Sequence, residues 1–234
     1  MTKKYWLVIL IYILVQGLSI AIPIILFPFL TIDIMTLAIY INIILFILAV
    51  IITLIIMRKD LQKEKAENPI STGAIIGWSI LGVILAWMAQ MVAISIEQLV
   101  FNIDQGSENT QEIVNITRTN PLFFIIPVFT APILEELIFR KIIFGSLHKK
   151  MHFFFAVLIS SLLFGVLHLE FQHLLIYFAM GVALAYVYVK TKRIIVPIIV
   201  HFAMNTIAML AQLLIDPAEL ERIQQEVSLI LFGG

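Results

Sequence analysis

Long apolar stretches follow one another along almost the whole chain, and they constrain its fold more than any other feature. A helix needs about 20 apolar residues to cross the roughly 30 Å hydrocarbon core of a bilayer. By that measure the sequence predicts about seven spans, with eight as the alternative. The predicted spans cover residues 5–28, 34–57, 73–101, 121–146, 153–170, 172–189 and 194–215. The expected fold class is therefore all-α, a polytopic transmembrane helix bundle.

Composition agrees with a membrane protein and excludes several kinds of function. Hydrophobic residues make up 62% of the 234 residues and charged residues 13%, whereas a soluble domain carries about 25% charged residues. The chain has no cysteine, which excludes disulfides, thiolate catalysis and cysteine-based metal sites. It also has no basic stripe of the kind that binds nucleic acid. The lipid bilayer is the partner that the composition predicts.

The basic residues between the predicted spans indicate the orientation of the chain. They form four clusters: Lys3 and Lys4; Arg58, Lys59, Lys63 and Lys65; Lys149 and Lys150; Lys190, Lys192 and Arg193. All four fall on one side of the predicted membrane, and the positive-inside rule assigns that side to the cytoplasm. We therefore expect a cytoplasmic N-terminus and an external polar loop at 102–120. The compact loops suggest an integral multi-pass protein of a bacterial cell membrane.

The fourth predicted span ends in three ionisable residues, Glu135, Glu136 and Arg140. An ionisable side chain within a bilayer costs several kcal/mol or more unless it is paired or neutral, so such residues need a reason. Glu136 and Arg140 are separated by four residues and share one helix face, which predicts an ion pair. Glu135 lies about 100° around the helix from Glu136. This position leaves Glu135 available as a general base.

Two later spans each add polar groups at helical spacing. The fifth contains Phe164 and His168, and the seventh contains His201 and Asn205 on one helix face. A lone histidine in a membrane helix is more often a packing residue than a catalyst. Three spans that each supply such groups favour a shared site. We also expect Gly165 and Gly181 to allow neighbouring helices to approach closely.

These three motifs, in this order, resemble the signature of the CPBP family. The family comprises the CAAX proteases and bacteriocin-processing enzymes, also called Abi proteins, and includes the type II CAAX prenyl endopeptidases. The resemblance covers about residues 121–215. It predicts N-terminal transmembrane helices and an external loop in 1–120, a catalytic helical core in 121–215, and a C-terminal tail in 216–234.

The resemblance implies an intramembrane endopeptidase that acts on a membrane-associated or lipidated peptide or protein. Glu135 and His168 would activate water, and His201 and Asn205 would stabilise the oxyanion. Glu136 and Arg140 would support this arrangement. Metal dependence is open: the preferred expectation is no cofactor, and zinc is the alternative, with Glu135, His168 and His201 as its ligands.

Two other functions remain as alternatives. One is a non-catalytic membrane regulator or bacteriocin-immunity protein, which would bind another membrane protein without cleaving it. The other is a proton-coupled transporter with Glu135 as the proton carrier. The transporter ranks last because no repeated half is visible in the sequence.

Overall fold

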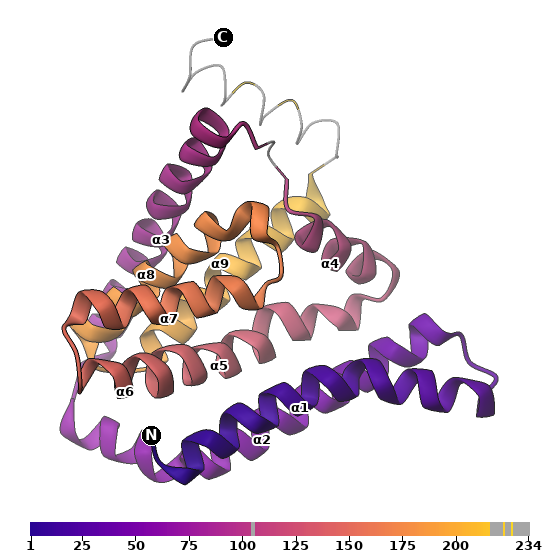
Figure 1. The fold of residues 1–234 in the computed structure, drawn as a ribbon, viewed down its shortest axis with the longest axis horizontal. Coiled ribbons are helices and arrows are strands. Elements are labelled where there is room, and N and C mark those ends of the chain that lie inside the picture. Colours follow the sequence, from indigo (N-terminus) through magenta and orange to yellow (C-terminus); the bar gives the residue numbers. More distant parts are fainter. Residues whose placement is uncertain (104–105, 216–221, 223–225, 227–234) are drawn as a thin grey trace.

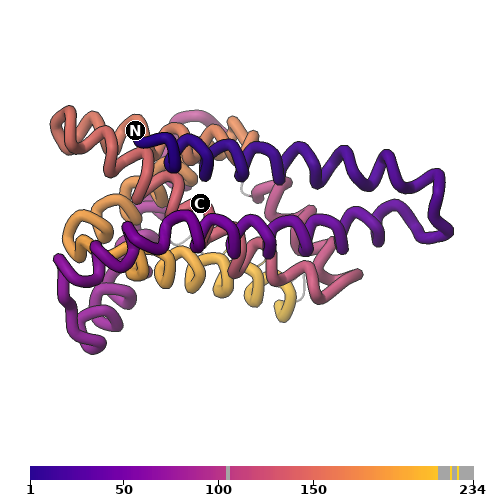
Figure 2. The backbone as a smooth tube through the Cα atoms, turned by 90° about the horizontal axis from the view of Figure 1, so that it is seen from below, coloured from indigo at the N-terminus to yellow at the C-terminus, as the bar shows by residue number. Residues whose placement is uncertain are grey.

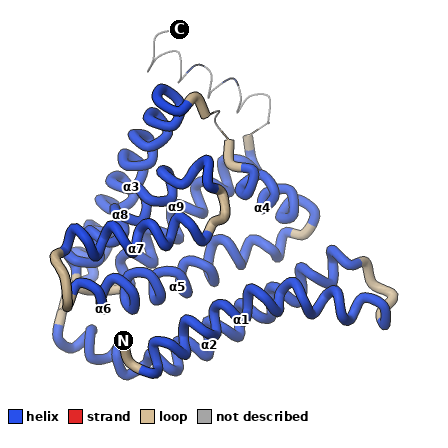
Figure 3. Tube along the Cα trace, in the orientation of Figure 1, coloured by secondary structure: helices blue, strands red, loops and turns tan. Residues whose placement is uncertain are grey.

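The computed structural model describes residues 1–103, 106–215, 222 and 226 (Figure 1). Within these residues the chain is helical and contains no strand, which confirms the all-α class (Figure 3). The predicted tail at 216–234 lies almost entirely outside the described residues.

Nine α-helices form the frame of the molecule, and short 3₁₀ and π segments join them. The α-helices are α1 (Lys3–Leu26), α2 (Ile34–Glu67), α3 (Thr72–Phe101), α4 (Glu108–Thr119), α5 (Ala131–Glu135), α6 (Gly145–His148), α7 (Phe153–Leu167), α8 (Leu174–Thr191) and α9 (Ile195–Leu214). The 3₁₀ turns are η1 (Phe27–Phe29), η2 (Pro121–Phe124) and η5 (Phe171–His173). The π-helical segments are η3 (Ile126–Thr130) and η4 (Glu136–Phe144). This count refers to the described residues only.

Six described helical segments are long and apolar enough to cross a membrane, and they match six of the predicted spans. The seventh, α7, is apolar but has only 15 residues, a length of about 22 Å. It was predicted to continue to residue 170. It ends instead at Leu167, because His168 caps it and Leu169 adopts a left-handed backbone with φ of 57°.

The external segment 102–120 was expected to be a loop, but it contains the helix α4. The segment is polar, but Ser107 forms the N-cap of a helix, because its side chain accepts a hydrogen bond from the Thr110 backbone N–H. Serine is among the preferred N-cap residues. Helix α4 therefore places polar side chains over one end of the bundle.

The helices divide into a hairpin and a core. Helices α1 and α2 pack against each other, and their tip extends past the core (Figures 1 and 2). In the core, α8 packs against α3, α7 and α9, and α7 also packs against η4. Gly181 allows the close approach of α7 and α8, since a Cβ atom there would lie 3.0 Å from the Ser161 Cα. This confirms the expected role of Gly181.

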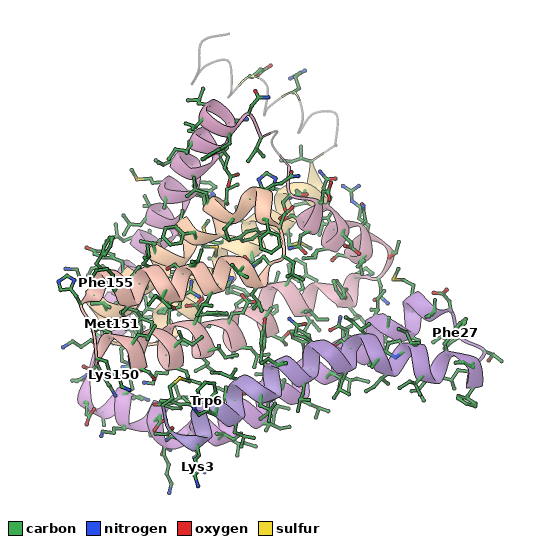
Figure 4. All side chains as sticks on the ribbon, viewed as in Figure 1. Lys3, Trp6, Phe27, Lys150, Met151 and Phe155 are labelled. Atoms are coloured by element: carbon green, nitrogen blue, oxygen red, sulfur yellow. The ribbon has the colours of Figure 1, made fainter. Side chains whose placement is uncertain are left out.

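The hairpin is fixed to the core at the end that carries the basic clusters. There the buried Glu64 of α2 pairs with Lys141 and accepts hydrogen bonds from the Tyr188 hydroxyl and from the backbone N–H of Ile194, at the start of α9. Figure 4 shows Lys3 and Lys150 toward this end of the molecule, and Phe27 at the opposite end. We call this the basic end.

Candidate active site

Two prolines shape the backbone that leads to the glutamate pair. The Ala131 N–H bonds to the Ile126 carbonyl, which is π-helical spacing, so it does not reach the Pro127 carbonyl. Pro132 is the next residue in line and has no N–H to offer. The Pro127 carbonyl is therefore left without a backbone donor. The span predicted over 121–146 is confirmed by the helical segment Pro121–His148. Its backbone is not α-helical throughout, because prolines at these two positions disrupt α-helical bonding.

Asn205 on α9 supplies the missing donor. Its Nδ2 donates a hydrogen bond to the Pro127 carbonyl at 2.8 Å. A buried carbonyl without a partner costs roughly 1–3 kcal/mol, so this contact stabilises the broken helix. It also orients the Asn205 amide, which has a second N–H hydrogen that this bond does not use.

Glu136, Arg140 and His201 form a buried cluster at the centre of the core. Arg140 Nη1 lies 3.0 Å from Glu136 Oε1, as the four-residue spacing predicts. His201 Nδ1 lies 2.9 Å from the same carboxylate oxygen. All three side chains are at most 2% exposed. Glu136 therefore contacts both Arg140 and His201 and is unavailable as a free base.

Glu135 faces a different set of partners. The Tyr12 hydroxyl, from α1, donates a hydrogen bond to Glu135 Oε1 at 3.5 Å. The other carboxylate oxygen lies 3.7 Å from His201 Nε2. His201 thus stands between the two glutamates, with one ring nitrogen toward each.

His168 caps α7, and its surroundings fix its ring. Nδ1 lies 2.9 Å from the Phe164 carbonyl. A carbonyl can only accept, so Nδ1 carries the hydrogen and the neutral ring has an unprotonated Nε2. The Tyr177 ring stacks on His168 with 4.0 Å between centroids. His168 is therefore held with a proton-accepting nitrogen available.

The Phe164 ring contacts three of the predicted site residues, Arg140, His168 and His201. The Arg140 guanidinium lies 4.3 Å from the ring centroid, within the range of a cation–π interaction. The rings of His168 and His201 meet Phe164 edge-on, at centroid distances of 4.8 and 5.8 Å. Phe164 therefore sets the spacing between the two histidines.

A cavity of about 430 Å³ opens beside these groups. Glu135, His168 and Asn205 line it. Tyr12 borders it from α1, and Tyr177 borders it from α8. His201 is not in this lining but contacts Glu135 from behind. The structure thus brings the six predicted site residues into one region, with Glu136 and Arg140 buried away from the cavity.

The turn between α7 and α8 attaches this site to the segment that contains α4. Glu170 in the turn accepts hydrogen bonds from the hydroxyls of Ser107 and Tyr177, each at 2.7 Å. Burial acts to raise the pKa of Glu170, but these two bonds outweigh it and lower the pKa below the ordinary value. The ionised Glu170 therefore holds Tyr177, the residue that stacks on His168.

Sequence reasoning missed Tyr12 and Tyr177 and assigned no role to Phe164. Tyr12 lies 123 positions from its partner Glu135, so no local spacing connects them. Phe164 belongs to the quoted motif, and its four-residue spacing from His168, which places both on one helix face, was the available signal. Tyr177 carried no comparable signal.

Zinc was the alternative expectation, with Glu135, His168 and His201 as its ligands. Within the described residues, no three His, Asp or Glu side chains are grouped closely enough to hold a metal ion. The zinc alternative stays a prediction, and the reaction proposed below uses the side chains alone.

Six apolar helical segments and a buried carboxylate–imidazole cluster characterise an integral membrane protein with ionisable groups in its interior. A carboxylate, an imidazole and a side-chain amide at one cavity are the kinds of group that peptide-bond hydrolysis requires. The class is that of membrane-embedded peptidases.

Comparison with known proteins gives the family. Residues 117–207 match the model of the type II CAAX prenyl endopeptidase Rce1-like family. The chain is 43% identical to the "Putative membrane peptidase YdiL" of Bacillus subtilis, over 100% of this chain and 99% of that protein. It is 34% identical to the "Membrane-embedded CAAX protease MroQ" of Staphylococcus aureus, over 96% of this chain and 94% of that protein. No solved structure matches.

The chain belongs to this Rce1-like CAAX protease family and is a membrane peptidase. The family membership confirms the resemblance drawn from the three motifs. It does not assign roles to individual residues.

Proposed function

We propose that the protein is an intramembrane endopeptidase that hydrolyses a peptide bond in a membrane-associated or lipidated peptide or protein. The observation that carries this proposal is the position of Glu135, His168 and Asn205 around one cavity, with His201 in contact with Glu135. The substrate peptide would enter that cavity. The proposed location is a bacterial cell membrane, with the basic end and the N-terminus in the cytoplasm.

Glu135 and His168 activate the attacking water. Glu135 is the carboxylate not engaged by Arg140, and it lies at the cavity wall. His168 offers an unprotonated Nε2, because its Nδ1 hydrogen is bonded to Phe164. A water held between a carboxylate and this nitrogen can lose a proton to either group as it attacks the carbonyl carbon. That proton then passes to the leaving amine.

His201 and Asn205 stabilise the negative charge on the carbonyl oxygen. In this proposal His201 donates through Nε2, which requires a protonated ring because the Nδ1 hydrogen faces Glu136. The second N–H of Asn205 is the other donor for the oxyanion.

The proposal is tested by cleavage assays on protein reconstituted in lipid. Substrates are first found by mass spectrometry, as membrane-associated peptides that accumulate in cells carrying Glu135→Ala. We expect Glu135→Ala and His168→Ala each to lower turnover by about 100- to 10,000-fold, the usual contribution of an acid–base group.

The matched control is His148→Ala, because His148 is exposed at the basic end and lies outside the cavity lining. It should cleave like the wild type. Unchanged proteolysis by folded Glu135→Ala and His168→Ala proteins would refute the proposed roles.

A further inference from the structure

In the first 60 residues, which hold most of the α1–α2 hairpin, side-chain amides occur at two positions, and both line the cavity. Gln16 and Asn42 are the only Asn or Gln among residues 1–60, and both line the cavity beside Glu135. The helices that carry them otherwise present mainly apolar side chains to the bilayer. Polar side chains in such helices usually face a partner or a cavity, because lipid offers them no hydrogen bond.

The hydrogen bonds of these amides leave part of each group available. Asn42 Oδ1 accepts from the Ser19 hydroxyl at 3.3 Å, but its Nδ2 has no partner among the described residues. Gln16 Nε2 donates to the Tyr12 hydroxyl at 3.4 Å, and its Oε1 accepts from no described residue. One amide thus offers a donor and the other an acceptor. Helix α4 contributes a third amide, Asn109, to the same lining.

The cavity combines these amides with a wall that has little charge. Glu135 and His168 are the only acidic, basic or histidine residues in its described lining. Most of the remaining lining is aliphatic or aromatic, as at Phe46, Ile113 and Met209. The hydroxyls of Tyr12, Tyr177 and Thr110 and the amide of Asn205 are its other polar groups. A charged ligand side chain would be desolvated here with no partner other than the reacting groups, which is costly.

We propose that Gln16, Asn42 and Asn109 bind the extended main chain of the substrate peptide, and that the side chains around the cleaved bond are uncharged. This inference rests on the proposed function. An extended peptide within a bilayer has unpaired N–H and C=O groups. A side-chain amide can pair with both kinds of group, because it has a donor end and an acceptor end. The hairpin thereby compensates the cost of holding the peptide unfolded at the site.

Binding can be tested separately from catalysis. The probe is a fluorescent ten-residue peptide of Ala, Leu and Ser with blocked ends, titrated into full-length protein in lipid nanodiscs. All proteins carry Glu135→Gln, so that the peptide is not cleaved. We expect Asn42→Leu and Asn109→Leu each to weaken binding about three- to tenfold, the loss of one hydrogen bond. A second probe has the same sequence with N-methylated central amides. It should bind the protein that carries Glu135→Gln alone about as weakly as the parent peptide binds the Asn42→Leu and Asn109→Leu variants.

The matched control is Gln90→Leu, because Gln90 lies within α3, half-buried, and contacts Met180 outside the cavity lining. It should bind the parent peptide normally. A third probe with Lys at a central position should bind more weakly than the parent. With Glu135 intact and a cleavable substrate, Asn42→Leu should raise KM and leave kcat nearly unchanged.

The inference is overturned if the parent peptide shows no saturable binding, or if the N-methylated peptide binds equally well. It is also overturned if Asn42→Leu and Asn109→Leu both bind like the Gln90→Leu control. Equal binding of parent and N-methylated peptides would indicate a cavity that accommodates lipid chains. These outcomes are distinct from failure of the proposed function, which appears as retained cleavage by the Glu135→Ala protein.

Discussion

At the scale of single residues, Phe164 has more influence on the site than its chemistry suggests. Its ring contacts Arg140 on one side and the two histidines at its edges. Its side chain has no titratable group, and it is not among the residues that line the described cavity. Its effect is positional, because catalytic groups must stand within a fraction of an ångström of their productive arrangement.

Replacing this ring should reduce activity through geometry alone. We expect Phe164→Leu to lower kcat about tenfold or more, since a branched aliphatic side chain offers neither a cation–π contact nor a flat spacer. The matched control is Phe154→Leu on the same helix, at a position 60% exposed. Steady-state kinetics in lipid measure both. Equal kcat for the two variants would contradict the positional role.

At the scale of elements, the π-helical break before Glu135 links two helices that are distant in sequence. The break frees the Pro127 carbonyl, and Asn205 of α9 binds it. Prolines inside a helix normally destabilise it by about 3 kcal/mol or more. Here Pro132 leaves the Pro127 carbonyl free, and this carbonyl orients the Asn205 amide of the proposed oxyanion site.

The substitution Pro132→Ala should separate stability from activity. It restores a backbone N–H that can compete for the Pro127 carbonyl and release Asn205. We expect thermal stability equal to or above that of the wild type. We expect activity to fall by about tenfold, because the Asn205 amide would no longer be fully aligned as an oxyanion donor. The control is Pro23→Ala, which removes a proline inside α1 away from the described cavity lining. Wild-type activity in a folded Pro132→Ala protein would argue against this link.

Sequence reasoning succeeded where one element decides the outcome. Hydropathy located the spans, and the four-residue spacing of Glu136 and Arg140 predicted their ion pair. It failed where several elements act together. The π-helical segment η3 depends on Pro127 and Pro132 together, and Asn205 binds the carbonyl that it leaves free. Helix α4 was missed for a local reason, because its polar sequence resembles a loop. No local pattern could have placed Tyr12 beside Glu135.

At the scale of the whole molecule, the cavity depends on both the hairpin and the core. The family model covers residues 117–207, but Tyr12, Gln16 and Asn42 complete the cavity wall from outside that range. Glu64 fixes the hairpin to the start of α9, the helix that carries His201. The hairpin therefore forms part of the cavity wall.

The orientation of the whole molecule can be measured directly, because the chain has no native cysteine. Single-cysteine variants are made at two exposed positions, Asn115 on α4 and Lys149 at the basic end. A membrane-impermeant maleimide added to intact cells should label Asn115→Cys and not Lys149→Cys, as the positive-inside rule predicts. Both should be labelled after the membrane is disrupted. The reverse pattern in intact cells would invert the proposed topology.

The contact of Tyr12 with Glu135, and of Glu135 with His201, has a consequence for biosynthesis. These three residues come from α1, α5 and α9. A ribosome makes the hairpin before it makes α9. The proposed hydrolytic centre is therefore incomplete until α9 has been made, so the nascent protein cannot cleave neighbouring membrane proteins while its earlier helices are being inserted.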